Sequence, residues 1–467
     1  METGKTLRGG AHLVFDAVDG VTHIVEGMYR NIAAGALPLG EAPEGSAPGI
    51  AGLVHSAVRQ VSGLTRKGLD FSLRQFSPQL DSIAPPGPYR EAIIAALNGV
   101  CGDHLARTDN PLAMPLRLRV ALPGYVEEAS RPNIPVEDIP VEDIPGLDDA
   151  KATSANAPPF AGLFDTHRRF VELYPLAKAF ADDDFNPGGR LLVAVHGLSM
   201  NDREWTSQNH NHIETLAVEQ GFTPVYVTYN SGKHISDNGR ELCDVLSRLV
   251  ADWPVPLESI SFVGFSMGGL VARSAMHNAQ QGNHAWMKRV DKAVYVGTPH
   301  HGAVMERGGF WLQKLLTYSP YTAPFAVLGR IRSDGITDLR HGNLRHEDWQ
   351  HHDEHDDNGD YRVPTPLAQG VEHFAIAATL SKKSGERIGK LLGDGLVHPS
   401  SATGRHANPQ HDLALGRERT RILYNVGHLA MLRDQRVMDQ LTIWLGGARE
   451  QAPAGLLEAS PRNHGKA

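Results

Sequence analysis

Six short, almost continuously apolar runs follow one another along the chain from Gly188 onward, and stretches of helical pattern separate them. A strand that is buried on both faces shows such a continuous run, whereas a strand with one wet face alternates apolar and polar residues. Strands and helices that alternate in this way form a mostly parallel sheet covered by helices. The sequence therefore predicts an α/β fold. The runs cover residues 191–195, 225–228, 260–263, 293–296, 374–378 and 422–426.

The third run leads into a Gly-x-Ser-x-Gly motif at residues 264–268, and a helical pattern follows it. A serine hydroxyl is a poor nucleophile unless a base reaches it, and a tight strand-to-helix turn exposes the Ser266 oxygen for that purpose. The flanking glycines keep the turn uncrowded, and the helix that begins there directs N–H groups at a developing oxyanion. The alternative is a merely tight glycine-rich turn. The strand before it and the helix after it favour Ser266 as a nucleophile.

An acid and a base are expected to follow such a serine along the chain. Asp394 stands in a Gly-Asp-Gly turn after the run at 374–378, and His428 comes directly after the run at 422–426. His398 is only four residues beyond Asp394, too close to bridge it to a distant serine. We therefore expect Asp394 as the acid and His428 as the base; the alternatives are a turn-forming aspartate and a satisfied surface histidine. Two less favoured candidates for the base are His406 and His411.

Two further segments resemble parts of known enzymes. The strand that ends in His-Gly-Leu at 196–198 resembles the turn after the third strand of α/β-hydrolase lipases. The Gly-Thr-Pro-His-His-Gly segment at 297–302 resembles the segment that follows their sixth strand. Residues 188–447 are thus similar to the α/β-hydrolase superfamily, and they resemble bacterial lipases and GPI inositol-deacylase-like serine hydrolases. One departure is Phe265, where such lipases usually carry histidine, and this departure bears on the substrate class.

The resemblance implies roles for individual residues. It implies that the backbone N–H groups of Leu198 and Met267 form the oxyanion hole. It implies that the turn at Asp394 corresponds to the acid turn of the family. It also implies that His196 shapes its loop and does not act as the base. A fold with a mostly parallel central sheet, flanking helices and a lid insertion is expected from the same resemblance.

Three parts are expected along the chain. Apolar residues spaced three and four apart predict helices at 14–32, 50–61 and 94–105, which we interpret as a small bundle; a membrane-surface hairpin is the alternative. Alternation at 116–122 predicts an edge strand. The parts are an N-terminal helical region at 1–112, an α/β-hydrolase domain at 113–447 with an acidic Pro-rich loop at 124–159 and a lid insertion at 303–372, and a flexible tail at 448–467.

The insertion at 303–372 carries an apolar and aromatic cluster at 310–328, which predicts a lid that shapes an acyl pocket and excludes water. Just before it, His300 and His301 are expected to be structural or to line a pocket. Within it, the segment 346–360 is rich in histidine and carboxylates. A metal site and a solvated acidic loop are the two interpretations, and the spacing matches no zinc or calcium loop, so we expect the acidic loop and no metal.

Composition narrows the class of protein. The net charge is −8 and no basic stripe is present, so nucleic acid is not expected as a partner. No unbroken apolar run approaches the roughly eighteen residues of a spanning helix, and no export signal is seen. Cys101 and Cys243 are too few for a disulfide framework. We expect a cytoplasmic protein, with peripheral contact to a membrane left open.

These patterns predict a serine hydrolase of the lipase or esterase kind, which cleaves lipid-like or medium-chain carboxylic esters through an acyl-enzyme and needs no cofactor. One alternative is an acyltransferase or thioesterase that uses the same triad. The other is a non-catalytic membrane- or partner-docking protein built on a hydrolase fold. The substrate is expected to be a small-molecule or lipid ester. Since the triad candidates lie beyond residue 260, a chain that starts near Pro111 is expected to keep its chemistry.

Overall fold

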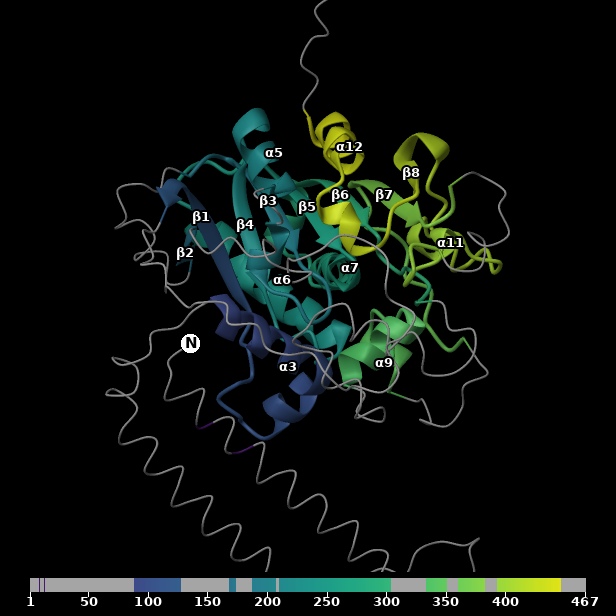
Figure 1. Ribbon diagram of the computed structural model, residues 1–467, viewed down its shortest axis with the longest axis horizontal. Coiled ribbons are helices and arrows are strands. Elements are labelled where there is room, and N and C mark those ends of the chain that lie inside the picture. Colours follow the sequence, from purple (N-terminus) through teal and green to yellow (C-terminus); the bar gives the residue numbers. More distant parts are fainter. Residues whose placement is uncertain are drawn as a thin grey trace, which may run out of the picture.

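The computed structural model describes residues 88–126, 168–173, 187–206, 210–303, 333–350, 360–382 and 393–446, together with Arg8 and His12. Eight strands form one sheet in the order β2-β1-β4-β3-β5-β6-β7-β8 (Figure 1). The strands are β1 Arg117–Val126, β2 Arg168–Glu172, β3 Arg190–Val195, β4 Thr223–Thr228, β5 Ser259–Phe265, β6 Val290–Val296, β7 Glu372–Thr379 and β8 Thr420–Tyr424.

All neighbouring pairs from β4 to β8 are parallel, and β1 pairs antiparallel with both β2 and β4. The six apolar runs of the sequence are confirmed as the strands β3 to β8. The strand expected at the sheet edge, 116–122, is instead the second strand, because the short polar segment β2 covers its outer side. The α/β class with a mostly parallel sheet and flanking helices is confirmed.

Helices cover the sheet on both faces. Alternate residues of β3 point to opposite sides: Val193 joins one apolar core cluster with Leu246 of α6, whereas Leu192 joins a second with Ile213 of α5 and Leu441 of α12. Both sets of side chains are buried, which explains why the strand reads as one continuous apolar run. The α-helices are α3 Pro88–Arg107, α5 His212–Gln220, α6 Ile235–Asp252, α7 Met267–Gln281, α9 Asp334–His341, α11 Pro399–Ala402 and α12 Gln435–Leu445.

Shorter helical turns complete the connections between these elements. The 3₁₀ turns are η1 Asp202–Trp205, η2 Ala285–Arg289, η4 His346–Asp348, η5 Arg417–Arg419 and η6 Leu429–Leu432.

Several sequence-based expectations lie outside the described residues. They are the helices at 14–32 and 50–61, the greater part of the loop at 124–159, the apolar cluster at 310–328 and the tail at 448–467. The helix expected at 94–105 is present as α3, and it lies beside α9 (Figure 1). Among the described helices, none is both long and apolar enough to cross a membrane.

Candidate active site

Ser266 stands at the junction of β5 and α7 in a conformation that non-glycine residues rarely adopt. Its φ is 52° and its ψ is −123°. The backbone is fixed there because the Ser266 N–H donates to Val296 O (2.8 Å) and the Gly269 N–H donates to Ser266 O (3.1 Å). A strained residue persists only where its surroundings hold it, and such residues gather at functional sites.

The two glycines of the motif are required by close packing. A Cβ at Gly264 would lie 2.5 Å from Gly269 Cα, and a Cβ at Gly268 would lie 2.0 Å from Val195 O. Both contacts are with backbone atoms, which cannot turn away as a side chain can. The spacing Gly-x-Ser-x-Gly is therefore what allows β5 to pass into α7 directly beside the end of β3.

The turn after β3 lies against Ser266. A Cβ at Gly197 would be 3.3 Å from Ser266 Cβ. The predicted oxyanion residues Leu198 and Met267 directly follow Gly197 and Ser266 along the chain. His196 is fully buried, and burial lowers its pKa to about 4. Its ring stacks on Tyr229 at 4.3 Å between centroids, and the Tyr229 hydroxyl donates to His196 O (2.8 Å). His196 is therefore a neutral ring held in the loop by stacking, as expected for a histidine that shapes the loop.

Asp394 and His428 form a buried pair. His428 Nδ1 lies 2.7 Å from Asp394 Oδ2, and an ionised carboxylate only accepts, so Nδ1 carries the proton. The other carboxylate oxygen accepts from the N–H groups of Leu396 (2.9 Å) and Val397 (2.8 Å). The His428 N–H donates in turn to Asp394 O (3.1 Å). These bonds fix the orientation of the imidazole ring.

The histidine ring of this pair lies beside the turn that holds Ser266. The rings of His428 and Phe265 are 5.0 Å apart between centroids, and a Cβ at Gly297 would lie 3.1 Å from His428 Cε1. His428 Nε2 is buried and has no hydrogen-bond partner among the described residues, Ser266 included. The hydrogen bond between a catalytic histidine and its serine is often long before substrate binds. The pair of Asp394 and His428 therefore lies beside Phe265, the residue before Ser266, at the carboxyl ends of β5, β7 and β8.

The other histidines weighed as a base make different contacts. His398 is the N-cap of α11, where its Nδ1 accepts from the Ser400 N–H (3.2 Å). The ring of His406 contacts the rings of His301 and His411, at 4.8 Å and 5.3 Å between centroids. His300 is buried and its Nδ1 lies 3.1 Å from Arg273 Nη1.

Helix α3 supports the loop that holds Leu198, which the sequence alone did not indicate. A Cβ at Gly99 would lie 1.8 Å from Ser199 Oγ and 2.8 Å from Ser199 Cα. Ser199 itself has a φ of 59°, and its N–H donates to Ser231 Oγ (2.9 Å). The helix is held from its other side by Ser333 Oγ, which donates to Gly99 O (2.7 Å). Helix and loop therefore share a contact that only glycine permits.

We expect Gly99→Ala to lower kcat by about tenfold, with a smaller change in KM. The added methyl group pushes the Ser199 backbone and with it Leu198, and full loss of one oxyanion donor costs about 10²–10³ in kcat. Steady-state kinetics on p-nitrophenyl butyrate measure the effect. Gly188→Ala is the control, because a Cβ there would only be in ordinary contact with Thr223 (3.4 Å). Unchanged kcat in folded Gly99→Ala would contradict the role of α3 in supporting the Leu198 loop. A clear loss of kcat would imply that a chain starting near Pro111, which lacks α3, is a poor enzyme.

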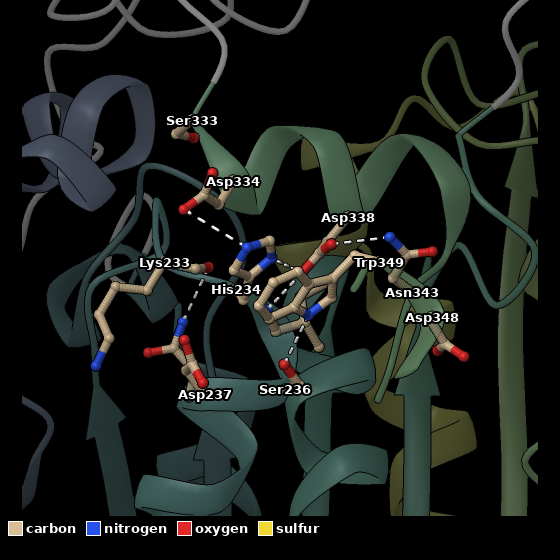
Figure 2. Close-up of polar contacts among 12 residues, drawn as sticks. Lys233, His234, Ser236, Asp237, Ser333, Asp334, Asp338, Asn343, Asp348 and Trp349 are labelled. Carbon is tan, nitrogen blue, oxygen red and sulfur yellow. Dashed lines mark hydrogen bonds and ion pairs between the residues drawn. The ribbon is translucent and has the colours of Figure 1, made fainter. Parts of the chain in front are cut away.

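A second histidine–aspartate pair lies away from Ser266, where the segment 333–350 packs on the start of α6 (Figure 2). His234 stacks on Trp349 with centroids 3.6 Å apart and planes within 1°. His234 Nδ1 is 3.0 Å from Asp338 Oδ2, which also accepts from the Ile235 N–H (2.8 Å). His234 Nε2 is 3.6 Å from Asp334. Burial acts to lower the pKa of His234, but the carboxylates outweigh it and the pKa is raised.

This second pair predicts a pH-dependent part of the stability. Because the pKa of His234 is higher in the folded chain than in the unfolded chain, its contribution is complete below the unfolded value of about 6.5. The contribution is lost as the pH rises through the raised pKa. The difference in Tm between the wild type and His234→Gln should therefore be largest in mild acid and shrink toward pH 9. The variant Ser236→Ala removes only the hydrogen bond from Trp349 Nε1 and no titratable group, so its effect on Tm should show no such trend.

Among the described residues, one group of three side chains has the spacing of metal ligands. Cys243, Asp244 and His284 bring their ligand atoms within 4.8 Å of one another. Burial, with a smaller effect of Asp244, raises the pKa of the Cys243 thiol to about 11. His284 Nδ1 already lies 2.6 Å from Ser247 Oγ. In the segment 346–360, residues 351–359 lie outside the described part of the chain.

Comparison with known proteins gives a family and a set of similar structures. Residues 186–330 match the family described as "Putative serine esterase (DUF676)". No curated protein sequence matches the chain. A lipase of Bacillus licheniformis in mature form is 18% identical over 56% of this chain and 95% of its own, with a TM-score of 0.36. An esterase of Pyrococcus furiosus is 14% identical over 56% and 84%, with a TM-score of 0.33.

The mostly parallel sheet covered by helices agrees with the fold that the resemblance of the motifs implied. The family match covers the strands β3 to β6 and the turn that carries Ser266. This match supports a serine hydrolase.

Proposed function

We propose that the chain hydrolyses carboxylic esters through an acyl-enzyme, with Ser266 as the nucleophile, His428 as the base and Asp394 as the acid of the triad. The observation that carries the proposal is the meeting of a strained serine at a strand-to-helix turn with a buried aspartate–histidine pair. Either feature alone has a structural explanation. Together they supply the three groups that acyl transfer requires, in the chain order Ser, Asp, His.

The reaction proceeds in two halves. Ser266 Oγ attacks the acyl carbon while His428 Nε2 takes its proton, and the imidazolium then gives this proton to the departing alkoxide. Water then attacks the acyl carbon while His428 takes one of its protons, and His428 returns this proton to Ser266 Oγ as the bond to the acyl group breaks and the acid leaves. Asp394 keeps the imidazole proton on Nδ1 in the resting state, so Nε2 is free to accept.

The developing oxyanion is stabilised by the backbone. The N–H groups of Leu198 and Met267 flank the serine, and Met267 opens α7, whose positive dipole end points at the same place. Both residues are buried, so water does not weaken these interactions. No cofactor takes part in this scheme.

An apolar acyl group suits the surroundings of the reacting atoms. The ring of Phe265 is almost fully buried beside His428, at the position where the lipases that the chain resembles usually carry histidine. We propose lipid-like or medium-chain acyl esters as substrates, with the insertion at 303–372 acting as the lid.

Labelling with a fluorophosphonate probe and hydrolysis of p-nitrophenyl acetate, butyrate and hexanoate test the proposal. Covalent labelling is expected, and kcat/KM should rise with chain length, because burying a methylene gives about 0.8 kcal/mol, roughly fourfold. Absence of both labelling and hydrolysis would contradict an acyl-enzyme. A strong preference for thioesters over the matching esters would favour a thioesterase.

A further inference from the structure

A polar pocket lies beside α7. It is formed where the loop after β6 meets the segments 342–348, 362–365 and 411–413. Its charged and titratable lining consists of Arg273, Arg362, Asp348, His300, His301 and His411. We call it the Arg273 pocket. Nothing in the proposed ester hydrolysis uses these side chains.

Arg273 is a buried cation without a paired carboxylate. Only 5% of the residue is exposed, and burial lowers its pKa to about 10. Nη2 donates to Thr365 O (2.8 Å) and Nη1 donates to His300 Nδ1 (3.1 Å). Both acceptors are neutral, and among the described residues no carboxylate lies within ion-pair distance of this guanidinium. Buried charges of this kind are costly unless a counter-charge is bound.

Arg362 brings a second guanidinium to the same pocket in a fixed orientation. Asp360 holds it from outside, because Arg362 Nε and Nη2 each donate to one carboxylate oxygen at 2.7 Å. Its remaining nitrogen, Nη1, donates to His300 O (3.2 Å) and lies 3.3 Å from His301 Nδ1. The side chain is 9% exposed, so this fork is preorganised rather than free in solvent.

The one carboxylate in the lining is already engaged by the backbone. Asp348 Oδ2 accepts from the N–H groups of Leu344 (2.8 Å) and Arg345 (2.9 Å), and Oδ1 accepts from the Val363 N–H (2.8 Å). Its charge lowers the net positive charge of the pocket, but its oxygens do not reach Arg273. The carboxylate therefore shapes the pocket wall and pairs with neither guanidinium group.

The histidines act as neutral hydrogen-bonding groups. Burial, followed by the charges of Arg362 and Arg273, lowers the pKa of His301, to about 4. His300 accepts from Arg273 through Nδ1, so its proton is on Nε2, which is buried and has no hydrogen-bond acceptor among the described residues. The pocket thus combines the Arg273 guanidinium, which has no carboxylate partner among the described residues, with the Asp360-paired guanidinium of Arg362 and with neutral donors. Such a combination recognises a small oxyanion.

We propose that the Arg273 pocket binds a small oxyanion of the phosphate class between Arg273 and Arg362. Either a free phosphate ion or the phosphate group of a larger ester supplies this chemistry. Arg273 lies seven residues along α7 from Ser266, about 10 Å at 1.5 Å per residue. His300 lies three residues beyond Gly297, which packs by His428. The pocket and the Ser266 turn thus share α7 and the loop after β6.

Binding of inorganic phosphate to the full chain tests the proposal without reference to activity. At constant ionic strength set with chloride, phosphate should raise Tm of the wild type in a saturable manner. Arg362→Gln and Arg273→Gln should each weaken phosphate binding at least tenfold. Arg362→Gln is the safer variant, because its side chain borders the open mouth. Arg436→Gln, at an exposed pair with Asp434, is the control and should bind as the wild type does.

The possible outcomes distinguish free phosphate from a phosphate group on the substrate. They also distinguish failure of this proposal from failure of the proposed function, on which the substrate assignment rests. No saturable effect in the wild type, or equal binding in both pocket variants and the wild type, overturns the proposal. If phosphate binds, kinetics on a pair of esters with and without a phosphate group on the alcohol identify the source. A KM at least tenfold lower for the phosphorylated ester, lost in Arg362→Gln, assigns the pocket to the substrate; equal KM values assign it to free phosphate. Phosphate binding by a chain without esterase activity would contradict the proposed function alone.

Discussion

Replacing Ser266 by alanine should lower kcat/KM for p-nitrophenyl esters by at least about four powers of ten and abolish fluorophosphonate labelling. Without the oxygen no acyl-enzyme forms, and the oxyanion donors and substrate binding supply only a small residual rate. The backbone contacts of the turn, Ser266 N–H to Val296 O and Gly269 N–H to Ser266 O, do not involve the side chain. The fold should therefore persist, which circular dichroism and thermal unfolding would report.

Ser259→Ala, at the opposite end of the same strand, is the matched control for this variant. It should retain labelling and activity. Labelling that persists in folded Ser266→Ala would assign the nucleophile to another residue.

The exchange Asp394→Asn should lower kcat by about 10⁴, the loss known for this exchange in a serine protease triad. One side of the new amide must accept from the Leu396 and Val397 N–H groups, so its oxygen turns to them and its NH₂ group faces His428. The imidazole then carries its proton on Nε2 and cannot accept one from Ser266. His428→Ala should be nearly inactive for the simpler reason that the base is absent.

The second histidine–aspartate pair provides the control for this prediction. Asp338→Asn disturbs a pair with His234 in which the aspartate is as fully buried as Asp394, and it should lower stability while the folded protein keeps its kcat. Activity that survives in His428→Ala but is lost on replacement of His398, His406 or His411 would show that the base is misplaced.

The strands β3 to β7 could be predicted because they are largely buried on both faces and read as apolar runs, whereas β8 carries an apolar run although Ile422 is exposed at the sheet edge. The turn at Ser266 could be predicted because its glycines stand at a fixed spacing around the serine, even though the contact that requires Gly268 is with the distant Val195 of β3. The strand β2 escaped prediction, since its five residues are Arg-Arg-Phe-Val-Glu and carry no period. Its pairing with β1 also displaces the expected edge strand inward, and such pairing depends on a partner about fifty residues away.

Contacts across long sequence distances were the other part that the sequence could not reveal. Gly99 and Ser199 are a hundred residues apart, and a helical period shows that α3 has an apolar face without showing what covers it. His234 and Asp338 likewise meet only in the folded chain. Asp394 and His428 could be selected from the many acidic residues and histidines because each follows a predicted strand and both come after Ser266 along the chain.

The positive φ of Ser266 carries a further consequence for the evolution of such a chain. Glycine adopts this region without strain, whereas another residue there costs on the order of 1–3 kcal/mol. Ser266→Gly should therefore be inactive and yet unfold at a higher temperature than the wild type. Selection for stability alone would remove this serine, so its retention at φ 52° is maintained only while the reaction itself is under selection.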